Sequence, residues 1–229
     1  MNNTMIALAA FAAAAAAQTP AEITPGIGQT FKQNAEALRQ YSYKRRTAVT
    51  IKGQARGARV DLVRYVDGKK ETVPLETPQQ GQGGGGGRAG GLRGRMMQKK
   101  KEEMKEDVQR LDNLLQRYIS PDHDSMRTAL ERAAISKTGP EPGADVKVVA
   151  TGLVVPSDSF TLTWSVVNKR PEKIEIRTEL DGKPVTATLE YAALPDGLFY
   201  AARTIVSDPK EDISVNIDSF DFTRGGDPQ

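Results

Sequence analysis

Side chains that could perform acid, base or nucleophilic chemistry are few in this chain. The sequence contains one histidine, no cysteine and no Gly-x-Ser-x-Gly motif, whereas a serine or threonine nucleophile usually needs a base within reach. Acidic residues are scattered over the polar faces of the expected strands, and their spacing singles out no pair for general acid–base catalysis. The sequence therefore predicts a protein that is not an enzyme, with an enzyme built on scattered carboxylates as an alternative.

The histidine, His123, stands between Asp122 and Asp124, and all three residue types bind cations. Adjacent residues at the start of a helix point in different directions, however, and the chain has no second His or Cys to complete a tetrahedral site. Aspartates are also favoured at the positive end of a helix. We therefore expect neither a metal site nor a cofactor.

A glycine-rich stretch at residues 79–94 predicts a flexible tether, because such a composition cannot form a packed element. Three interpretations fit the basic residues in and after it: a plain linker, a contact with an anionic membrane surface, or an RGG-type RNA-binding segment. No aromatic residue is interleaved for base stacking, and the net charge of the whole chain is only +3, so no nucleic-acid partner is expected. The basic residues are Arg88, Arg93, Arg95, Lys99, Lys100 and Lys101.

The N-terminal segment has the pattern of a secretory signal peptide. Residues 5–17 are apolar, and Ala15-Ala16-Ala17 supplies the small residues that a signal peptidase recognises. These 13 residues are fewer than the roughly 20 that span a bilayer as a helix. We expect residues 1–17 to be removed by cleavage near Ala17, which would leave a periplasmic or secreted protein without a transmembrane segment. It would fold without disulfides, because it has no cysteine.

Helical periodicity appears in two parts of the chain. Residues 28–40 place Phe31, Ala35 and Leu38 on one stripe, which predicts a short helix that packs on a sheet. A helical insertion at residues 95–135 is expected to form a long helix and then a second helix ending near residue 135. The stripe of the long helix is either ordinary core or an adaptable cover for a ligand, because Met repacks easily. It consists of Met97, Met104, Val108, Leu111, Leu115 and Tyr118.

Alternation of apolar and polar residues predicts the strands. A long strand begins at Tyr41, and hairpins follow to about residue 76, where Pro74 restricts the third strand to an edge. Six more strands between residues 146 and 222 leave no room for crossover helices, so the sheet must be antiparallel. Hairpin turns are expected at Asp67-Gly68, Asp181-Gly182 and Asp196-Gly197.

The order of these parts resembles the outer-membrane lipoprotein carrier family and its periplasmic lipid-binding half-barrel relatives. The segment AEALRQYSYKRRTAVTI is similar to that family's opening of helix, aromatic residues and alternating strand. The Arg-Pro pair that carriers place in an early strand occurs here as Arg170-Pro171 in a late hairpin, and no functional residue is carried over from it. The resemblance implies an α+β fold: a curved antiparallel sheet, an incomplete β-barrel, covered by an N-terminal helix and the two-helix insertion. The length that remains after cleavage predicts a single β-rich domain over residues 18–224, and residues 225–229 are expected to be a disordered tail.

The favoured function is an exported, non-enzymatic binding protein that holds acyl chains of a lipid or lipoprotein under the helices. The alternative is an exported structural or interaction module whose apolar face is a filled core, since Leu, Ile and Val line both. The candidate ligand-binding residues are Phe160, Leu162, Trp164, Ile174, Ile176, Leu189, Met104 and Leu111.

Overall fold

The computed structural model describes residues 20–75, 106, 109–111, 113–115, 117–118, 123–141 and 143–225. Several expectations lie outside the described residues and stay predictions. These are the signal peptide at residues 1–17, the tether at 79–94, the basic residues from Arg88 to Lys101, the candidate Met104, and residues 226–229 of the tail.

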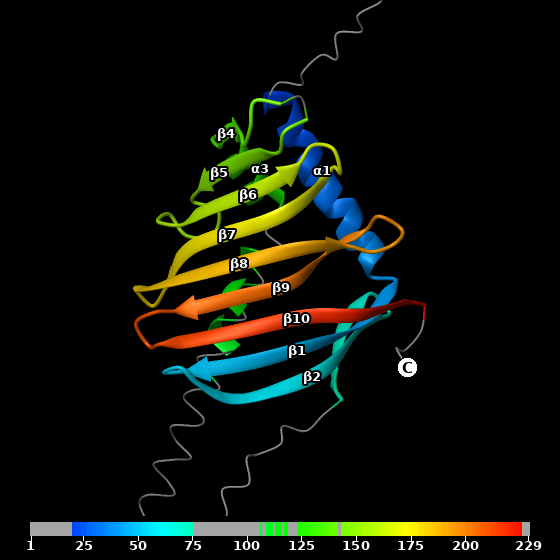
Figure 1. Cartoon of the computed structure of the whole chain (residues 1–229), viewed down its shortest axis with the longest axis vertical. Coiled ribbons are helices and arrows are strands. Elements are labelled where there is room, and N and C mark those ends of the chain that lie inside the picture. The colour runs from blue at the N-terminus through cyan, green and yellow to red at the C-terminus, as the bar shows by residue number, and fades with distance from the viewer. Residues whose placement is uncertain are drawn as a thin grey trace, which may run out of the picture.

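Ten strands form one open, curved antiparallel sheet in the order β3-β2-β1-β10-β9-β8-β7-β6-β5-β4. Strands β4 to β10 follow chain order, and β1 pairs with β10, so the first and the last strand of the chain are neighbours within the sheet (Figure 1). The strands are β1 (Tyr41–Ile51), β2 (Gln54–Val66), β3 (Lys69–Pro74), β4 (Ala134–Lys137), β5 (Val146–Thr151), β6 (Ser159–Ser165), β7 (Arg170–Leu180), β8 (Lys183–Ala193), β9 (Phe199–Asp208) and β10 (Ile213–Arg224). The expected antiparallel sheet is confirmed, and Pro74 ends an edge strand as predicted.

Hairpin turns use the residues that tolerate left-handed backbone. Asp67 and Gly68 have φ angles of 51° and 75°, and Asp181 and Gly182 have φ angles of 52° and 70°. Two consecutive positive φ values match the right-handed twist of the flanking strands. The first hairpin turns at Lys52 and Gly53, which also adopt positive φ angles.

The helices differ from the expectation at their ends. Helix α1 (Pro20–Leu38) begins before residue 28, and its buried positions include Ile27 and Asn34, while Ala35 is exposed. Helix α3 (His123–Glu131) stops short of residue 135. The prediction of a helix to Ile135 was wrong, because Ile135 lies in β4, opposite Val148 of β5, and strand pairing there outweighs helical periodicity.

Three helical parts cover one face of the sheet, and we call them the helical cover. They are α1, α3, and the residues between 106 and 118, which are helical at every described position. In Figure 1 they lie behind the sheet. Their apolar side chains join those of β5 to β10 in one hydrophobic cluster, so this face contains the core.

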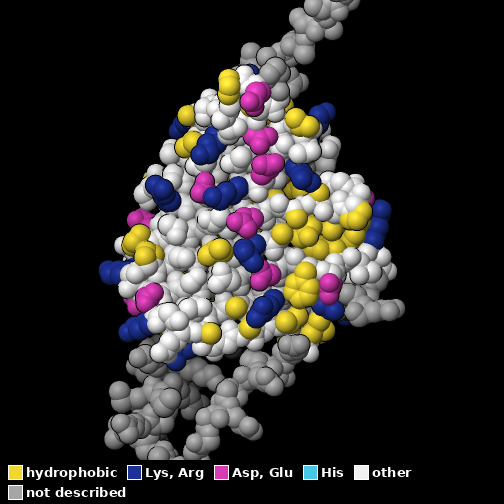
Figure 2. All heavy atoms as spheres, in the orientation of Figure 1, with side chains coloured by type: hydrophobic (Ala, Val, Ile, Leu, Met, Phe, Trp, Pro, Cys, Tyr) yellow, Lys and Arg dark blue, Asp and Glu magenta, His cyan; other side chains and the backbone are white. Residues whose placement is uncertain are grey.

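The opposite face of the sheet is polar and faces the viewer in Figure 2, where basic and acidic side chains are interspersed and hydrophobic side chains gather toward the right of the view. Arg203 and Asp218 form one of its ion pairs, at 3.2 Å between Nε and Oδ1. The predicted division into a buried face and a wet face is therefore confirmed.

Candidate ligand-binding face

The pairing register between neighbouring strands places the predicted strand residues in two rows on one face of the sheet. In the first row, Phe160 of β6 lies opposite Ile176 of β7, and the row continues through β8, β9 and β10 to Val49 of β1. In the second, Leu162 lies opposite Ile174, which lies opposite Leu189 of β8. Directly opposed residues project to the same side of a sheet. The structure therefore places the predicted strand residues on one shared face of the sheet.

All six strand candidates are buried. Phe160, Leu162, Trp164, Ile174, Ile176 and Leu189 are each 4% exposed or less, and all belong to the hydrophobic cluster. Leu111 of the cover, 3% exposed, belongs to the same cluster. The structure thus brings together seven of the eight candidates, and Met104 lies outside the described residues.

Helix α1 is fixed on the face by ring contacts and by an amide. Phe31 lies 6.1 Å from Trp164 and 5.3 Å from Phe199, measured between ring centroids. The Asn34 side chain donates to the carbonyl oxygen of Phe199 at 2.7 Å and accepts from its N–H at 2.8 Å. Apolar periodicity missed Asn34 because it is polar, and no local signal distinguishes it from an exposed asparagine.

The 106–118 part of the cover packs through an apolar stripe that ends in a polar contact. Leu111, Leu114, Leu115 and Tyr118 are all buried in the hydrophobic cluster. The Tyr118 hydroxyl lies 2.8 Å from Oδ2 of Asp158 and 2.7 Å from Oγ1 of Thr178. Because a carboxylate only accepts, the Tyr118 hydroxyl donates to Asp158, and its oxygen accepts the Thr178 proton.

Asp158 organises the loop between β5 and β6 as well as the cover. Its buried carboxylate accepts backbone N–H groups from Leu153, Val154 and Val155 at 2.7 to 2.9 Å. Burial alone raises the pKa of this carboxyl, but the three backbone donors and the Tyr118 hydroxyl outweigh burial and hold the pKa below its usual value. Burial, followed by the hydrogen bond with Asp158, raises the pKa of the Tyr118 hydroxyl. The pair therefore stays ionised at Asp158 and neutral at Tyr118 near neutral pH.

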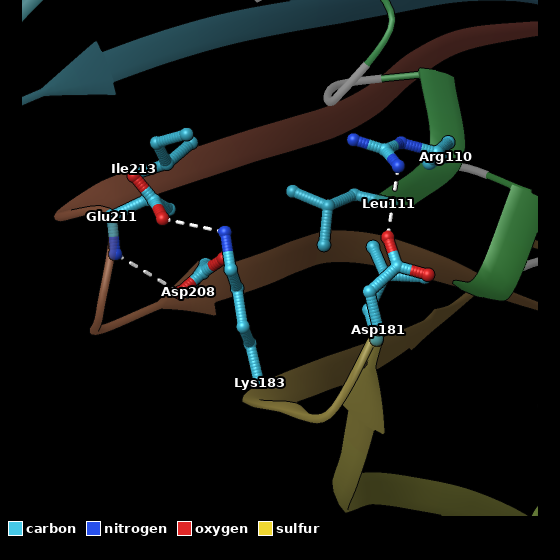
Figure 3. Close-up of a pocket in the computed structure, with 8 residues that line it drawn as sticks. Arg110, Leu111, Asp181, Lys183, Asp208, Glu211 and Ile213 are labelled. Atoms are coloured by element: carbon cyan, nitrogen blue, oxygen red, sulfur yellow. Dashed lines mark hydrogen bonds and ion pairs between the residues drawn. The ribbon is translucent and has the colours of Figure 1, made fainter.

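A small depression lies where the cover meets two hairpin turns (Figure 3). Two ion pairs border it: Arg110 with Asp181 at 2.8 Å, and Lys183 with Glu211 at 2.6 Å. Leu111 and Ile213 also line it. Its free volume of about 20 Å³ is room for about one water molecule. This depression is therefore too small for an acyl chain.

In the part of the chain that the structure describes, no helix is both long enough and apolar enough to cross a membrane. The same residues contain no group of three or more His, Cys, Asp or Glu side chains arranged to hold a metal ion.

No family model and no curated protein matches the chain. Among solved structures, the chain is similar to a DUF1329 family protein from Desulfovibrio piger, with 10% identity, a TM-score of 0.42, and coverage of 88% of this chain and 92% of that chain. It is similar to a putative outer membrane lipoprotein-sorting protein domain from Vibrio parahaemolyticus, with 11% identity, a TM-score of 0.41, and coverage of 86% and 90%. It is also similar to a LolA superfamily protein from Nitrosomonas europaea, with 12% identity, a TM-score of 0.34, and coverage of 86% and 93%.

Proposed function

We propose that this chain is a non-enzymatic binding protein that holds an apolar ligand, an acyl chain of a lipid or lipoprotein, between the sheet and the helical cover. The observation that carries the proposal is the continuous apolar face, which crosses the sheet from β5 to β10 and is covered by helices and not by a second sheet. A helical cover can separate from a sheet without breaking any strand pairing. An acyl chain could then replace the side chains of the cover.

The contacts of the 106–118 segment support a cover that can move. Its described contacts with the sheet are apolar side chains, the buried Tyr118 contact, and the exposed ion pair of Arg110 with Asp181. Exposed ion pairs contribute only about 0 to 1 kcal/mol. Much of its attachment therefore comes from apolar burial, which an acyl chain would supply equally well.

The close packing of the described side chains favours a second candidate, the structural or interaction module with a filled core. Leu162, Ile176 and Leu189 are almost completely buried and belong to one cluster with the cover. In that case the same residues act only as core. The two candidates differ in whether an added acyl chain enters the interface.

Export remains part of the proposal, since an acyl carrier of this type would act in the periplasm or outside the cell. Sequencing the mature N-terminus of protein from the native host is expected to give Gln18 or a residue within a few positions of it. A mature protein that retains Met1 would contradict export and leave the binding proposal to the next test.

The direct test uses Trp164, the only tryptophan of the chain, which lies among the candidate residues. Fatty acids of increasing length are titrated while Trp164 fluorescence is recorded. Each buried methylene contributes about 0.8 kcal/mol, so affinity should rise with chain length and then level off when the interface is full. A saturable response with such a limit supports the binding protein, and no response in the full chain supports the filled core.

Two phenylalanine variants separate the candidates further. If the face admits a ligand, Leu162→Phe should lower the affinity for the longest fatty acids and cause little loss of stability. In a filled core the same change should destabilise the chain by about 1 to 3 kcal/mol through overpacking. Thr161→Phe, on the opposite face of the same strand, is the matched control and should change neither quantity appreciably.

A further inference from the structure

The face that carries the apolar rows becomes charged beyond β10. The second row continues from Leu189 through Thr204 and Ile217 to Thr47 of β1, and it ends at Arg59 of β2. In the neighbouring row, Arg45 of β1 lies opposite Asp61 of β2. Opposed residues share a face, so Arg45, Arg59 and Asp61 lie on the same side of the sheet as Leu189. We call these three residues the charged end.

Two of the three charges at this end, Arg45 and Asp61, are largely buried but incompletely bonded. The Asp61 side chain is 2% exposed and the Arg45 side chain 13% exposed. Oδ2 of Asp61 lies 3.1 Å from Nε of Arg59 and 3.7 Å from Nη2 of Arg45. Even so, neither Oδ2 of Asp61 nor Nε of Arg45 makes a hydrogen bond, because the Arg59 contact lacks the required alignment and the Arg45 contact is too long. A buried polar group without a partner is rare and usually has a functional explanation.

Arg45 lies in partly buried surroundings. Tyr43 is the preceding residue on the same face, and burial raises the pKa of its hydroxyl to about 12. Two guanidinium groups face one carboxylate, so the cluster has one positive charge in excess. Guanidinium groups bind phosphate and carboxylate oxygens with paired, charge-assisted hydrogen bonds. An anion would therefore satisfy the free Arg45 N–H and balance the charge.

We propose that Arg45 and Arg59, oriented by Asp61, bind the anionic group, a phosphate or a carboxylate, of an amphiphile whose acyl chain lies on the apolar rows. This inference rests on the proposed function and adds the class of the ligand's head group. Arg59 stands two strands from Ile217 along one row, which corresponds to about 10 Å. One amphiphile can therefore contact both regions.

The test compares two probes that differ only by a phosphate: lysophosphatidic acid and the monoacylglycerol with the same acyl chain. Their dissociation constants for the full chain are measured by calorimetry. The full chain should bind lysophosphatidic acid at least about tenfold more tightly, as expected for charge-assisted hydrogen bonds. Arg45→Met should reduce the ratio of the two affinities to about one without lowering the affinity for monoacylglycerol. Arg46→Met is the matched control, because Arg46 is the next residue, exposed and on the opposite face.

Further variants keep the test decisive if Arg45→Met does not fold. The side chain of Arg59 is 54% exposed, so Arg59→Met should fold and should lower the ratio of the affinities for lysophosphatidic acid and monoacylglycerol. Asp61→Asn should raise this ratio, because it removes a competing negative charge. A ratio that stays the same in all three variants overturns the inference. If neither probe binds, the proposed function itself fails.

Inorganic phosphate distinguishes a lipid head group from a free anion. Phosphate that competes with lysophosphatidic acid, but not with monoacylglycerol, supports the head-group site. Phosphate that binds to the chain at Arg45 while the two amphiphiles bind equally well would show a site for the free anion and would overturn the proposal.

Discussion

Two aspartates, each 1% exposed, show how differently the two ends of this sheet treat a buried charge. Asp158 accepts four hydrogen bonds, three from backbone N–H groups and one from Tyr118. Asp61 has ion-pair contacts with two arginines, but its Oδ2 makes no hydrogen bond. A satisfied buried carboxylate stabilises its surroundings, whereas an unsatisfied one costs free energy. The first therefore fits a structural contact, whereas the second leaves Nε of Arg45 without a hydrogen bond, which fits a site that an anion completes.

The same contrast separates the apolar rows from the charged end. The apolar rows bury Phe160, Leu162 and Ile176 under the cover and supply much of the stability. The charged end buries Arg45 and Asp61 without full compensation, which contributes little to stability. Substitutions in the apolar rows should therefore change mainly the free energy of unfolding. Substitutions at the charged end should change mainly the relative affinity for different ligands.

The largest effect is expected from Leu162→Ala. Removing a fully buried leucine leaves a cavity beneath the cover and should lower the free energy of unfolding by about 2 to 5 kcal/mol. Urea denaturation measures this loss. Val73→Ala, at the half-exposed edge strand β3, is the control and should change stability by about 0.5 kcal/mol or less. Similar losses in the two variants would contradict the division between a buried core and an exposed edge.

A smaller effect is expected from Tyr118→Phe, which removes one donor from Asp158. A hydrogen bond to a charged group contributes about 1.5 to 3 kcal/mol, so the variant should be less stable by about that amount at pH 7. The pKa of Asp158 is lowered in the folded state, so this contribution is present above the unfolded pKa of about 3.9 and is lost as the pH falls through the folded pKa. Urea denaturation at several pH values should show the wild-type and variant curves converging in acid.

The surface hydrogen bond of Tyr41 with Asp196, 2.6 Å long, provides the comparison for Tyr118. Tyr41→Phe removes an exposed tyrosine–aspartate hydrogen bond and should lower the free energy of unfolding clearly less than Tyr118→Phe does. Equal losses in the two variants would mean that the burial of the Tyr118 contact gives it no special weight.

The smallest effect is expected from Arg110→Gln. Arg110 and Asp181 are both more than half exposed, and such pairs contribute about 0 to 1 kcal/mol, which added salt reduces further. Thermal unfolding in low and high salt measures the change. A loss comparable to that of Tyr118→Phe would show that the ion pair, and not the buried contact, attaches this end of the cover.

Much of the candidate site could be predicted from local pattern, because side-chain direction in a strand alternates with a period of two. Phe160, Leu162 and Trp164 were placed on the buried face for this reason, and the glycine after each of Asp67 and Asp181 marked its hairpin. The end of α3 and the strand at Ile135 could not be predicted, because they depend on pairing with β5. Asn34 was missed because its partner, the Phe199 backbone, is 165 positions away in the chain.

The sequence by itself determined the antiparallel sheet, its buried face and the stripe of Leu111, Leu115 and Tyr118, since each follows from the geometry of neighbouring residues. Only the tertiary structure decided that β1 pairs with β10 and that Arg45 faces Asp61 on the same side as the apolar rows. Register between strands is set by long-range pairing, and the burial of a charge depends on what packs around it. For this reason the sequence alone could not distinguish Arg45 and Arg59 from the other arginines as a candidate site.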